Sequence, residues 1–327
     1  MDTIHWGIIG VGDVTEIKSG PAFYKIDHSS LVAVMRRNKE KVMDYARRHN
    51  VKAWYTDADQ LINDPEVNAI YVATPPDSHK EYAIKALQAG KPVYVEKPMA
   101  MHYNDCLEMI EAAQNSGQKL FVAYYRRALP YFQKVKELLD QNSIGRILTV
   151  DVEYVCPPFE SDLDPARHTW RVKADIAGEG YFYDLAPHTL DILDFLLGEI
   201  TDAKGFSQNS GHYYAVKDTI TANFQFASGI VGTGKWCFVS SKTSIRDTVT
   251  IVGTKGEISF NTFAFQPIEL KRENGIDLFP FEKPLHIQQP LIQTIVDELR
   301  GVGNCPSTGI SGARTSRIMD IILKNGN

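Results

Sequence analysis

Side chains suited to proton transfer stand at two places in the chain. Glu96 and Lys97 put a carboxylate beside an ammonium, directly after the apolar run Val93–Val95. Asp184 and His188 put a carboxylate and an imidazole four residues apart, and on a helix that spacing brings both to one face. A lysine or histidine within hydrogen-bond distance of a reacting hydroxyl serves as its acid or base. Lys97, His188 and Asp184 are therefore the candidate catalytic residues.

A glycine-rich turn precedes both places. Gly10 permits a tight turn, and Gly12 lets the backbone approach a pyrophosphate where the next helix begins, at Asp13 and Val14. Thr15 takes the place of the third glycine in the usual G-x-G-x-x-G pattern. Two glycines also mark ordinary strand-to-helix turns, but their place after the first strand of an alternating pattern favours dinucleotide binding.

The end of the second apolar segment bears on the choice of cofactor. Enzymes that bind NAD usually place an acidic residue here for the ribose hydroxyls, whereas this chain has Arg36 and Arg37. Two guanidinium groups can hold the 2′-phosphate of NADP. The alternative is a solvated basic turn. The sequence therefore predicts NADP as the preferred cofactor, and NAD otherwise.

Another turn leaves the carboxyl end of an apolar segment at Thr74 and Pro75. Ligands bind at this edge of open parallel sheets, so we expect both residues to line the ribose and nicotinamide side of the cofactor. His79 follows shortly after. It either reaches the cofactor or is an ordinary surface histidine.

The elements that position these residues alternate between strand and helix up to residue 123. This alternation predicts a parallel, doubly wound Rossmann sheet in a domain spanning 1–123. Ser78 and Glu81 match a capping box, and Gly90 and Gly117 follow helices where a left-handed residue is needed. The expected strands are 4–9, 31–35, 69–73, 93–95 and 120–123, and the expected helices are 39–49, 58–62, 78–89 and 104–116.

The remaining domain, 124–327, is expected to be α+β with a mainly antiparallel open sheet and a hairpin at 227–229. Pro187 fits a helix that begins near Asp184, because first-turn amides need no helical partner. Helices on one face leave the other face open to a second copy, which predicts a homodimer or homotetramer formed through this sheet. The expected strands are 147–155, 219–226, 230–239, 248–252 and 257–260, and the expected helices are 129–141, 184–197 and a closing helix at 312–324.

Four motifs in this order resemble the Gfo/Idh/MocA oxidoreductases, relatives of glucose–fructose oxidoreductase and inositol 2-dehydrogenase. The resemblance covers nearly the whole chain. Thr15 and Glu179 depart from it, because relatives usually carry a small residue at the first place and often a glycine at the second. The motifs are the glycine turn, Ala73-Thr74-Pro75, Glu96-Lys97-Pro98 and Gly178-x-Gly180-x-x-x-Asp184-x-x-x-His188.

The resemblance implies hydride transfer between a nicotinamide and a secondary alcohol or ketone of a sugar, inositol or similar polyol. It implies that Glu96 contacts the cofactor and that Lys97 lies beside the reacting hydroxyl. His188 is then the acid, base or substrate ligand, and Asp184 binds substrate. Because Asp191 continues the same face, a metal held by Asp184, His188 and Asp191 is an alternative, but we assign no metal.

The resemblance also places three further residues near cofactor and substrate: Arg127, Trp170 and Arg171. Arginines at domain joints form structural ion pairs equally often. Two other activities remain open for such a chain, an NAD-dependent glycosidase that acts by transient oxidation and a non-enzymatic regulator that senses a ligand. The two arginines after the second strand disfavour the former, and the intact acid–base residues disfavour the latter.

The composition limits the classes of partner. With 327 residues the chain is long enough for two domains, and its formal net charge of -5 argues against a nucleic-acid or anionic-membrane partner. No apolar run approaches the about 18 residues of a bilayer span, and the start leaves no room for a signal peptide. The four cysteines form no Cys-x-x-Cys pair, which is typical of reduced thiols in a cytoplasmic protein.

Overall fold

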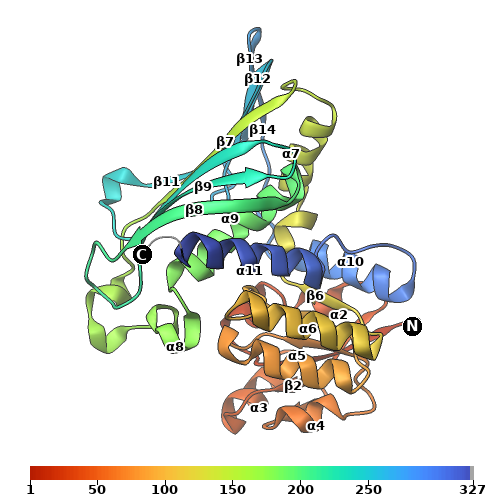
Figure 1. The fold of residues 1–327 in the computed structure, drawn as a ribbon. Coiled ribbons are helices and arrows are strands. Elements are labelled where there is room, and N and C mark those ends of the chain that lie inside the picture. The colour runs from red at the N-terminus through yellow and green to blue at the C-terminus, as the bar shows by residue number, and fades with distance from the viewer. Residues whose placement is uncertain (325–327) are drawn as a thin grey trace. The chain divides into compact units, whose positions relative to one another are not determined.

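The protein consists of two units in this computed structural model, which describes residues 1–324 (Figure 1). The first unit contains Met1–Leu129 and Pro284–Ala313, and the second contains Pro130–Lys283 and the segment from Arg314 onward. The last three residues of the predicted second domain lie outside the described residues. Each unit is built on one sheet.

The sheet of the first unit is parallel and has the strand order β3-β2-β1-β4-β5-β6. Strands β4, β5 and β6 are buried along their whole length, as a sheet covered on both faces requires. The doubly wound fold is thereby confirmed. Only Ala53–Tyr55 was not predicted, because this short strand carries an exposed Trp54. The strands are β1 (Ile4–Ile9), β2 (Ser29–Met35), β3 (Ala53–Tyr55), β4 (Ala69–Val72), β5 (Val93–Val95) and β6 (Leu120–Val122).

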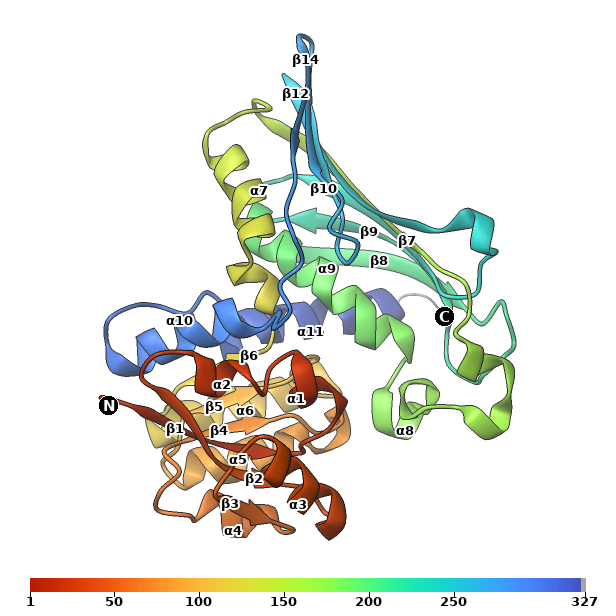
Figure 2. The same cartoon turned by 180° about the vertical axis from the view of Figure 1, so that it is seen from behind.

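Helices cover both faces of this sheet, with α5 and α6 on one side (Figure 1) and α1 and α2 on the other (Figure 2). Gly90 and Gly117 have φ of +77° and +66° after their helices, as predicted. The helices are α1 (Asp13–Ile17), α2 (Ala22–Lys25), α3 (Lys39–Arg48), α4 (Ala58–Ile62), α5 (His79–Gln88), α6 (Tyr103–Ser116) and α10 (Gln289–Arg300), with 3-10 turns η1 (Pro76–Ser78) and η2 (Tyr125–Ala128).

The predicted capping box before α5 is wrong. The Ser78 hydroxyl turns back and donates to Thr74 Oγ1 at 2.9 Å, while Glu81 pairs with Lys85 at 3.0 Å. The reason is local, because η1 precedes α5 and gives Ser78 a turn conformation in place of the extended one that a capping side chain needs.

Residues 284–313 pack with the first unit, although the sequence analysis assigned them to the second domain. The Ser307 hydroxyl donates to the carbonyl of Val122 at 2.7 Å, and Thr308 forms an isolated bridge with Phe121. The backbone amide of Gln288 donates to the carbonyl of Lys18 at 3.1 Å. These bonds attach the segment to β6 and to the end of α1.

The sheet of the second unit has the order β14-β13-β12-β11-β7-β10-β9-β8. Only the β7–β10 pair is parallel among these described strands, so the mainly antiparallel sheet is confirmed. The hairpin at 227–229 is confirmed too, with Gly229 at φ +85°. The strands are β7 (Ile147–Val155), β8 (Ile200–Gln208), β9 (Thr219–Phe226), β10 (Val231–Cys237), β11 (Arg246–Gly253), β12 (Gly256–Phe260), β13 (Ile268–Arg272) and β14 (Gly275–Phe279).

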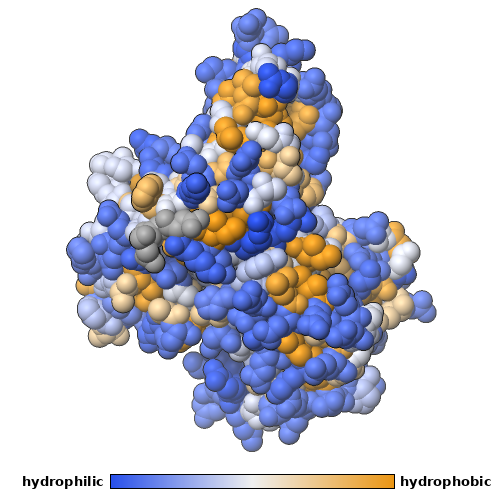
Figure 3. Space-filling view, viewed as in Figure 1, coloured by the Kyte–Doolittle hydropathy of each residue, from blue (hydrophilic) through white to orange (hydrophobic). Residues whose placement is uncertain are grey.

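One face of this sheet is covered by helix α9 (Figure 2). Gly205 lies on the covered face, where a Cβ would approach Ile322 of α11 to 2.9 Å. On the other face Lys204 and Phe206 are exposed, and Figure 3 shows apolar patches among hydrophilic residues over these strands. The helices are α7 (Pro130–Asp140), α8 (Ala174–Ala177), α9 (Tyr181–Leu197) and α11 (Gly309–Lys324), with 3-10 turns η3 (Glu160–Leu163), η4 (Pro165–Arg167), η5 (Trp170–Val172) and η6 (Lys242–Ser244).

Helix α9 begins three residues earlier than predicted. Gly180 caps it with φ +63° and accepts the amide of Asp184 at 3.1 Å. Pro187 therefore lies inside the helix, where it removes one intrahelical donor. The first-turn argument for Pro187 is wrong, but Asp184 and His188 still share one face. No helix within residues 1–324 is long and apolar enough to cross a membrane.

Candidate active site

The turn between β1 and α1 has the geometry of a phosphate cradle. Gly10 has φ +94°, and a Cβ there would lie 2.6 Å from Thr74 Cγ2, so only glycine fits. A Cβ on Gly12 would meet nothing closer than the Gly10 carbonyl oxygen at 3.9 Å. Gly12 therefore borders open space, which fits the close approach of a pyrophosphate to the start of α1 at Asp13 and Val14.

Thr15 explains how the turn dispenses with the third glycine. Its buried hydroxyl accepts the Gly12 amide at 3.0 Å and donates to the Gly12 carbonyl at 2.8 Å. A hydroxyl can do both, since it has one proton and two lone pairs. The side chain thus holds the turn in place from inside the unit.

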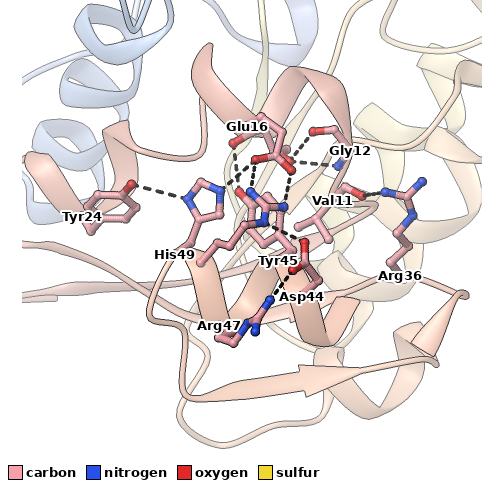
Figure 4. A network of polar contacts seen from close by, with 11 residues as sticks. Val11, Gly12, Glu16, Tyr24, Arg36, Asp44, Tyr45, Arg47 and His49 are labelled. Atoms are coloured by element: carbon pink, nitrogen blue, oxygen red, sulfur yellow. Dashed lines mark hydrogen bonds and ion pairs between the residues drawn. The ribbon is translucent and has the colours of Figure 1, made fainter. Parts of the chain in front are cut away.

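Arg36 lies at the end of β2, as predicted, and its Nη1 donates to the carbonyl of Val11 at 3.1 Å (Figure 4). Arg37 is exposed. The structure thereby brings Arg36 to the glycine turn. Arg36 also lines a hollow of about 390 Å³, together with Glu16, Glu40, Lys41, Asp44, Tyr45 and Arg48.

Two of the acids in this hollow are neutralised by arginine. Arg48 donates to both Glu16 oxygens at 2.7 and 2.8 Å, and these bonds lower the pKa of Glu16 to about 2. Asp44 accepts from Arg47 and Arg48 at 2.8 and 2.7 Å. Glu40 is a third acid in the lining, so carboxylates stand beside Arg36 and Lys41 in this hollow.

Thr74 and Pro75 follow β4, and both are half-buried. His79 is fully buried, with one ring nitrogen 2.7 Å from the Thr74 carbonyl and the other 2.9 Å from the Pro98 carbonyl. Burial lowers the pKa of His79. The surface alternative is wrong, and the ring has no exposed atoms to offer a cofactor. Its place in the structure is to tie the turn after β4 to the turn after β5.

Glu96 and Lys97 follow β5 directly. Glu96 is 6% exposed and accepts the Lys97 amide at 3.1 Å through Oε2, while Lys97 itself is half-buried. Arg127 is buried, and its Nη1 donates to the carbonyl of Pro306 at 3.2 Å. That bond gives Arg127 a structural task within the first unit.

In the second unit three predicted residues meet. Arg171 Nε donates to Asp184 Oδ2 at 3.0 Å, and the Arg171 guanidinium lies 4.7 Å from the centre of the Trp170 ring. Trp170 and Arg171 come from η5 and Asp184 from the first turns of α9. The ion pair holds the Asp184 carboxylate in one orientation at the start of the helix.

His188 follows one turn later and is buried against an aromatic ring. Phe263 meets the imidazole edge-on at 5.7 Å, and Tyr154 packs on Phe263 at 4.9 Å. Asp247 fixes this neighbour by accepting the Phe263 amide at 2.7 Å. The contact of Phe263 with His188 could not be predicted, because a phenylalanine in an irregular loop matches no motif.

A metal site on this face finds no support. Asp191 is buried, and Thr315 Oγ1 lies 3.5 Å from its Oδ1. Among residues 1–324 no group of three or more His, Cys, Asp or Glu side chains is placed to hold a metal ion.

Two family models match the chain. Residues 4–124 match an oxidoreductase family with an NAD-binding Rossmann fold, and residues 132–259 match the GFO/IDH/MocA C-terminal domain. The matched segments fall on the first and second sheets.

Individual proteins agree with these models. Oxidoreductase P35 of Formosa agariphila is 39% identical over 97% of this chain and 98% of its own. A 1,5-anhydro-D-fructose reductase of Ensifer adhaerens is 26% identical over 94% and 92%. Levoglucosan dehydrogenase in complex with NADH and levoglucosan has the same fold, with a TM-score of 0.86 and 22% identity over 99% and 97%. The chain therefore belongs to the Gfo/Idh/MocA family of oxidoreductases.

Proposed function

We propose that the protein is an NADP-preferring dehydrogenase or reductase for a secondary alcohol or ketone of a sugar, inositol or similar polyol. The observation that carries the proposal is the half-buried Lys97 beside a buried Glu96, in a unit where Gly12 borders open space. Names of relatives support the substrate class, among them 1,5-anhydro-D-fructose reductase and trans-1,2-dihydrobenzene-1,2-diol dehydrogenase.

Lys97 handles the proton in this proposal. The nicotinamide, when bound, supplies or takes up the hydride. An alcohol releases hydride only as its hydroxyl proton leaves, so a base must stand within hydrogen-bond distance of that hydroxyl. Lys97 accepts the proton during oxidation, and in the reverse direction its ammonium polarises the carbonyl and returns the proton.

Asp184 and His188 bind the substrate in this proposal. Asp184 accepts hydrogen bonds from hydroxyls in the orientation that Arg171 gives it. His188, fixed against Phe263, acts as hydroxyl ligand or as a second acid–base group. The exposed aromatic edge of Phe159, 4.9 Å from Tyr181, offers a ring on which a sugar can stack.

Arg36 and Arg37 select NADP in this proposal. Arg36 already contacts the glycine turn through Val11, and its hollow lies where an acid would bind ribose hydroxyls in an NAD enzyme. A 2′-phosphate carries two negative charges that a fork of guanidinium donors matches.

A second copy of this chain is the proposed partner of the open sheet face. Phe206 is 80% exposed there, between Lys204 and the strands β9 and β10. The face has a hollow of about 450 Å³ lined by apolar, amide and charged side chains. Mixed surfaces of this kind suit pairing between copies of one protein.

The test is a polyol screen with NADP⁺ and, in parallel, NAD⁺, read by the absorbance of the reduced nicotinamide. Oxidation of at least one sugar, inositol or anhydrosugar with faster turnover on NADP⁺ is expected. Release of sugar from a glycoside without net cofactor reduction would instead identify the glycosidase activity. Cofactor binding without turnover across the panel would leave a ligand sensor.

A further inference from the structure

We propose that Tyr71 and Gln288 are positioning residues for Lys97, acting through the Glu96 carboxylate. The inference rests on the proposed function, because it assigns a task to residues that support the proposed catalytic lysine. It involves only side chains of the first unit. Neither residue belongs to a motif in the sequence, and Gln288 lies 192 positions from Glu96.

Glu96 is surrounded by donors. The Tyr71 hydroxyl lies 2.6 Å from Glu96 Oε1, and Gln288 Nε2 lies 2.6 Å from the same oxygen. The Lys97 amide occupies the other oxygen at 3.1 Å. Tyr71 and Gln288 have no exposed surface. Three donors on a nearly buried carboxylate fix both of its oxygens in place.

The orientation of Gln288 is itself determined. Its Nε2 faces Glu96 because a carboxylate only accepts, and its Oε1 then accepts the hydroxyl of Tyr94 at 2.7 Å. Tyr94 stacks on Tyr71 with ring centres 4.8 Å apart. Burial raises the pKa of both phenols well above the usual value, so both remain neutral donors.

The same two residues reach the helix that carries the glycine turn. The backbone amide of Gln288 donates to the carbonyl of Lys18, which ends α1. Ser19 Oγ lies 3.2 Å from the Tyr71 hydroxyl. The Ser19 hydroxyl donates its own proton to the carbonyl of Val14 at 3.3 Å, so it meets Tyr71 as an acceptor.

Glu96 is therefore attached to the end of α1 by two buried routes, one through Tyr71 and one through Gln288. Lys97 is the next residue, and its amide is bonded to the same carboxylate. The distance between Lys97 and the glycine turn after β1 is thus set by this polar network and not by the chain that follows β5 alone. A small displacement of a reacting group costs much of its rate.

Two variants remove one donor each, and each has a matched control. Gln288→Met and Tyr71→Phe delete a bond to Glu96 while keeping side-chain volume. Gln293→Met and Tyr55→Phe delete bonds to Asp297 and Asp64 in the same unit. The paired design separates the loss of a bond to Glu96 from the loss of any hydrogen bond in the unit.

The first readout is steady-state turnover with NADP⁺ and the polyol found in the screen. We expect kcat to fall about 10-fold or more in both variants, with KM and the NADPH dissociation constant within about 3-fold of wild type.

The variant Gln288→Glu sharpens this readout. Two carboxyl groups at this distance share one proton, which replaces the lost donor. Turnover should therefore approach wild type at the acidic end and fall as pH rises, a dependence on pH that Gln288→Met lacks. A residue with only a structural task would not show this difference between the two variants.

The second readout needs no substrate. Acetic anhydride at neutral pH labels lysines in their amine form, and mass spectrometry gives the rate at Lys97. We expect Lys97 to label about 3-fold faster in Gln288→Met and Tyr71→Phe, because a Lys97 backbone that Glu96 holds less firmly exposes the side chain more often. Lys91 is the internal reference.

Lower unfolding midpoints with unchanged kcat, pH profile and Lys97 labelling would overturn the positioning claim. The labelling result stands even if wild-type protein oxidises no polyol, because labelling does not depend on turnover. Failure of the proposed function and failure of this inference are thereby distinguished.

Discussion

At the scale of single residues, the proposed function assigns proton transfer to Lys97, a lysine beside a carboxylate that the fold holds in place. Lys97 is half-buried directly after β5, and the adjacent Glu96 is nearly buried. On the second unit the Arg171–Asp184 pair at 3.0 Å holds a carboxylate one turn before His188. These residues were predicted from type and spacing, since their helix and strand contexts follow from local patterns.

Lys97→Met tests the assignment of the proton-transfer group. We expect turnover to fall by about 100-fold or more, the usual contribution of general acid–base catalysis. NADPH affinity should stay within about 3-fold, because the pyrophosphate and ribose contacts lie elsewhere. Lys91→Met is the control, since Lys91 is half-buried in the same unit and binds only the carbonyl of Asp64 among its side-chain bonds in residues 1–324. Near-normal turnover of Lys97→Met would exclude the lysine.

Glu16 gives a pH prediction. Its pKa is about 2 in the folded protein against an ordinary 4.5, chiefly because of the bonds from Arg48. As pH falls below 4.5, Glu16 takes up a proton in the unfolded chain but stays ionised in the folded protein. The free energy of unfolding therefore decreases towards pH 2. Urea unfolding of wild type should thus lose free energy more steeply on acidification than Glu16→Gln. Parallel curves for the two proteins would contradict the pairing.

The residues that the sequence did not reveal lie far along the chain from the residues that they contact. Phe263 beside His188 and Gln288 beside Glu96 come from segments without a motif. His79 was predicted as cofactor-binding or exposed, and it is buried between two carbonyls. Spacing reports neighbours on one element, whereas these contacts form only after distant segments pack.

At the scale of elements, the two glycines of the β1–α1 turn differ in what their missing side chain allows. Gly10 has a positive φ and contacts Thr74, so its lack of a side chain serves the fold. Gly12 has an extended backbone and borders open space, and we propose that its lack of a side chain serves a ligand. Motif reading names both glycines but does not distinguish these roles.

Gly10→Ala and Gly12→Ala test this separation. We expect Gly10→Ala to lower the free energy of unfolding by about 2 kcal/mol or more, from backbone strain and overlap with Thr74. Gly12→Ala should leave stability within about 0.5 kcal/mol and weaken NADPH binding about 10-fold or more. Calorimetry and fluorescence titration measure the two effects. An equal loss of stability in both variants would contradict the proposal that Gly12 leaves room for a pyrophosphate.

Element boundaries show where local patterns stop being informative. Apart from β3, the strands of the first sheet were predicted within a few residues because apolar runs mark them. The start of α9 was misplaced because Gly180, an unusual cap with positive φ, begins the helix before Asp184. Strand β8 was missed because polar and small residues interrupt its alternation, and β13 and β14 were missed because each has only 5 residues.

At the scale of the whole molecule, each unit has its own sheet, and the fold class followed from the change in pattern near residue 123. The return of 284–313 to the first unit did not, because bonds such as Ser307 to Val122 join segments far apart in sequence. The open face of the second sheet was foreseen from helices packing on one side. Its occupant remains a proposal.

Phe206→Glu tests self-association. Wild-type protein should be a dimer or tetramer by light scattering, and a carboxylate at this exposed position should shift it towards monomer, since an unpaired buried charge opposes association. Val302→Glu is the control, because Val302 is equally apolar and exposed on a loop of the first unit. Unchanged mass in the Phe206 variant would exclude this face.

The most direct test of the central claim is a fluorescence titration with NADPH and NADH, after charcoal treatment has removed any carried nucleotide. Both should bind, NADPH about 10-fold or more tightly. Replacing Arg36 and Arg37 by alanine should abolish the preference while leaving NADH affinity nearly unchanged. Tighter NADH binding that ignores these substitutions would contradict the cofactor assignment, and binding of neither nucleotide would contradict the oxidoreductase function itself.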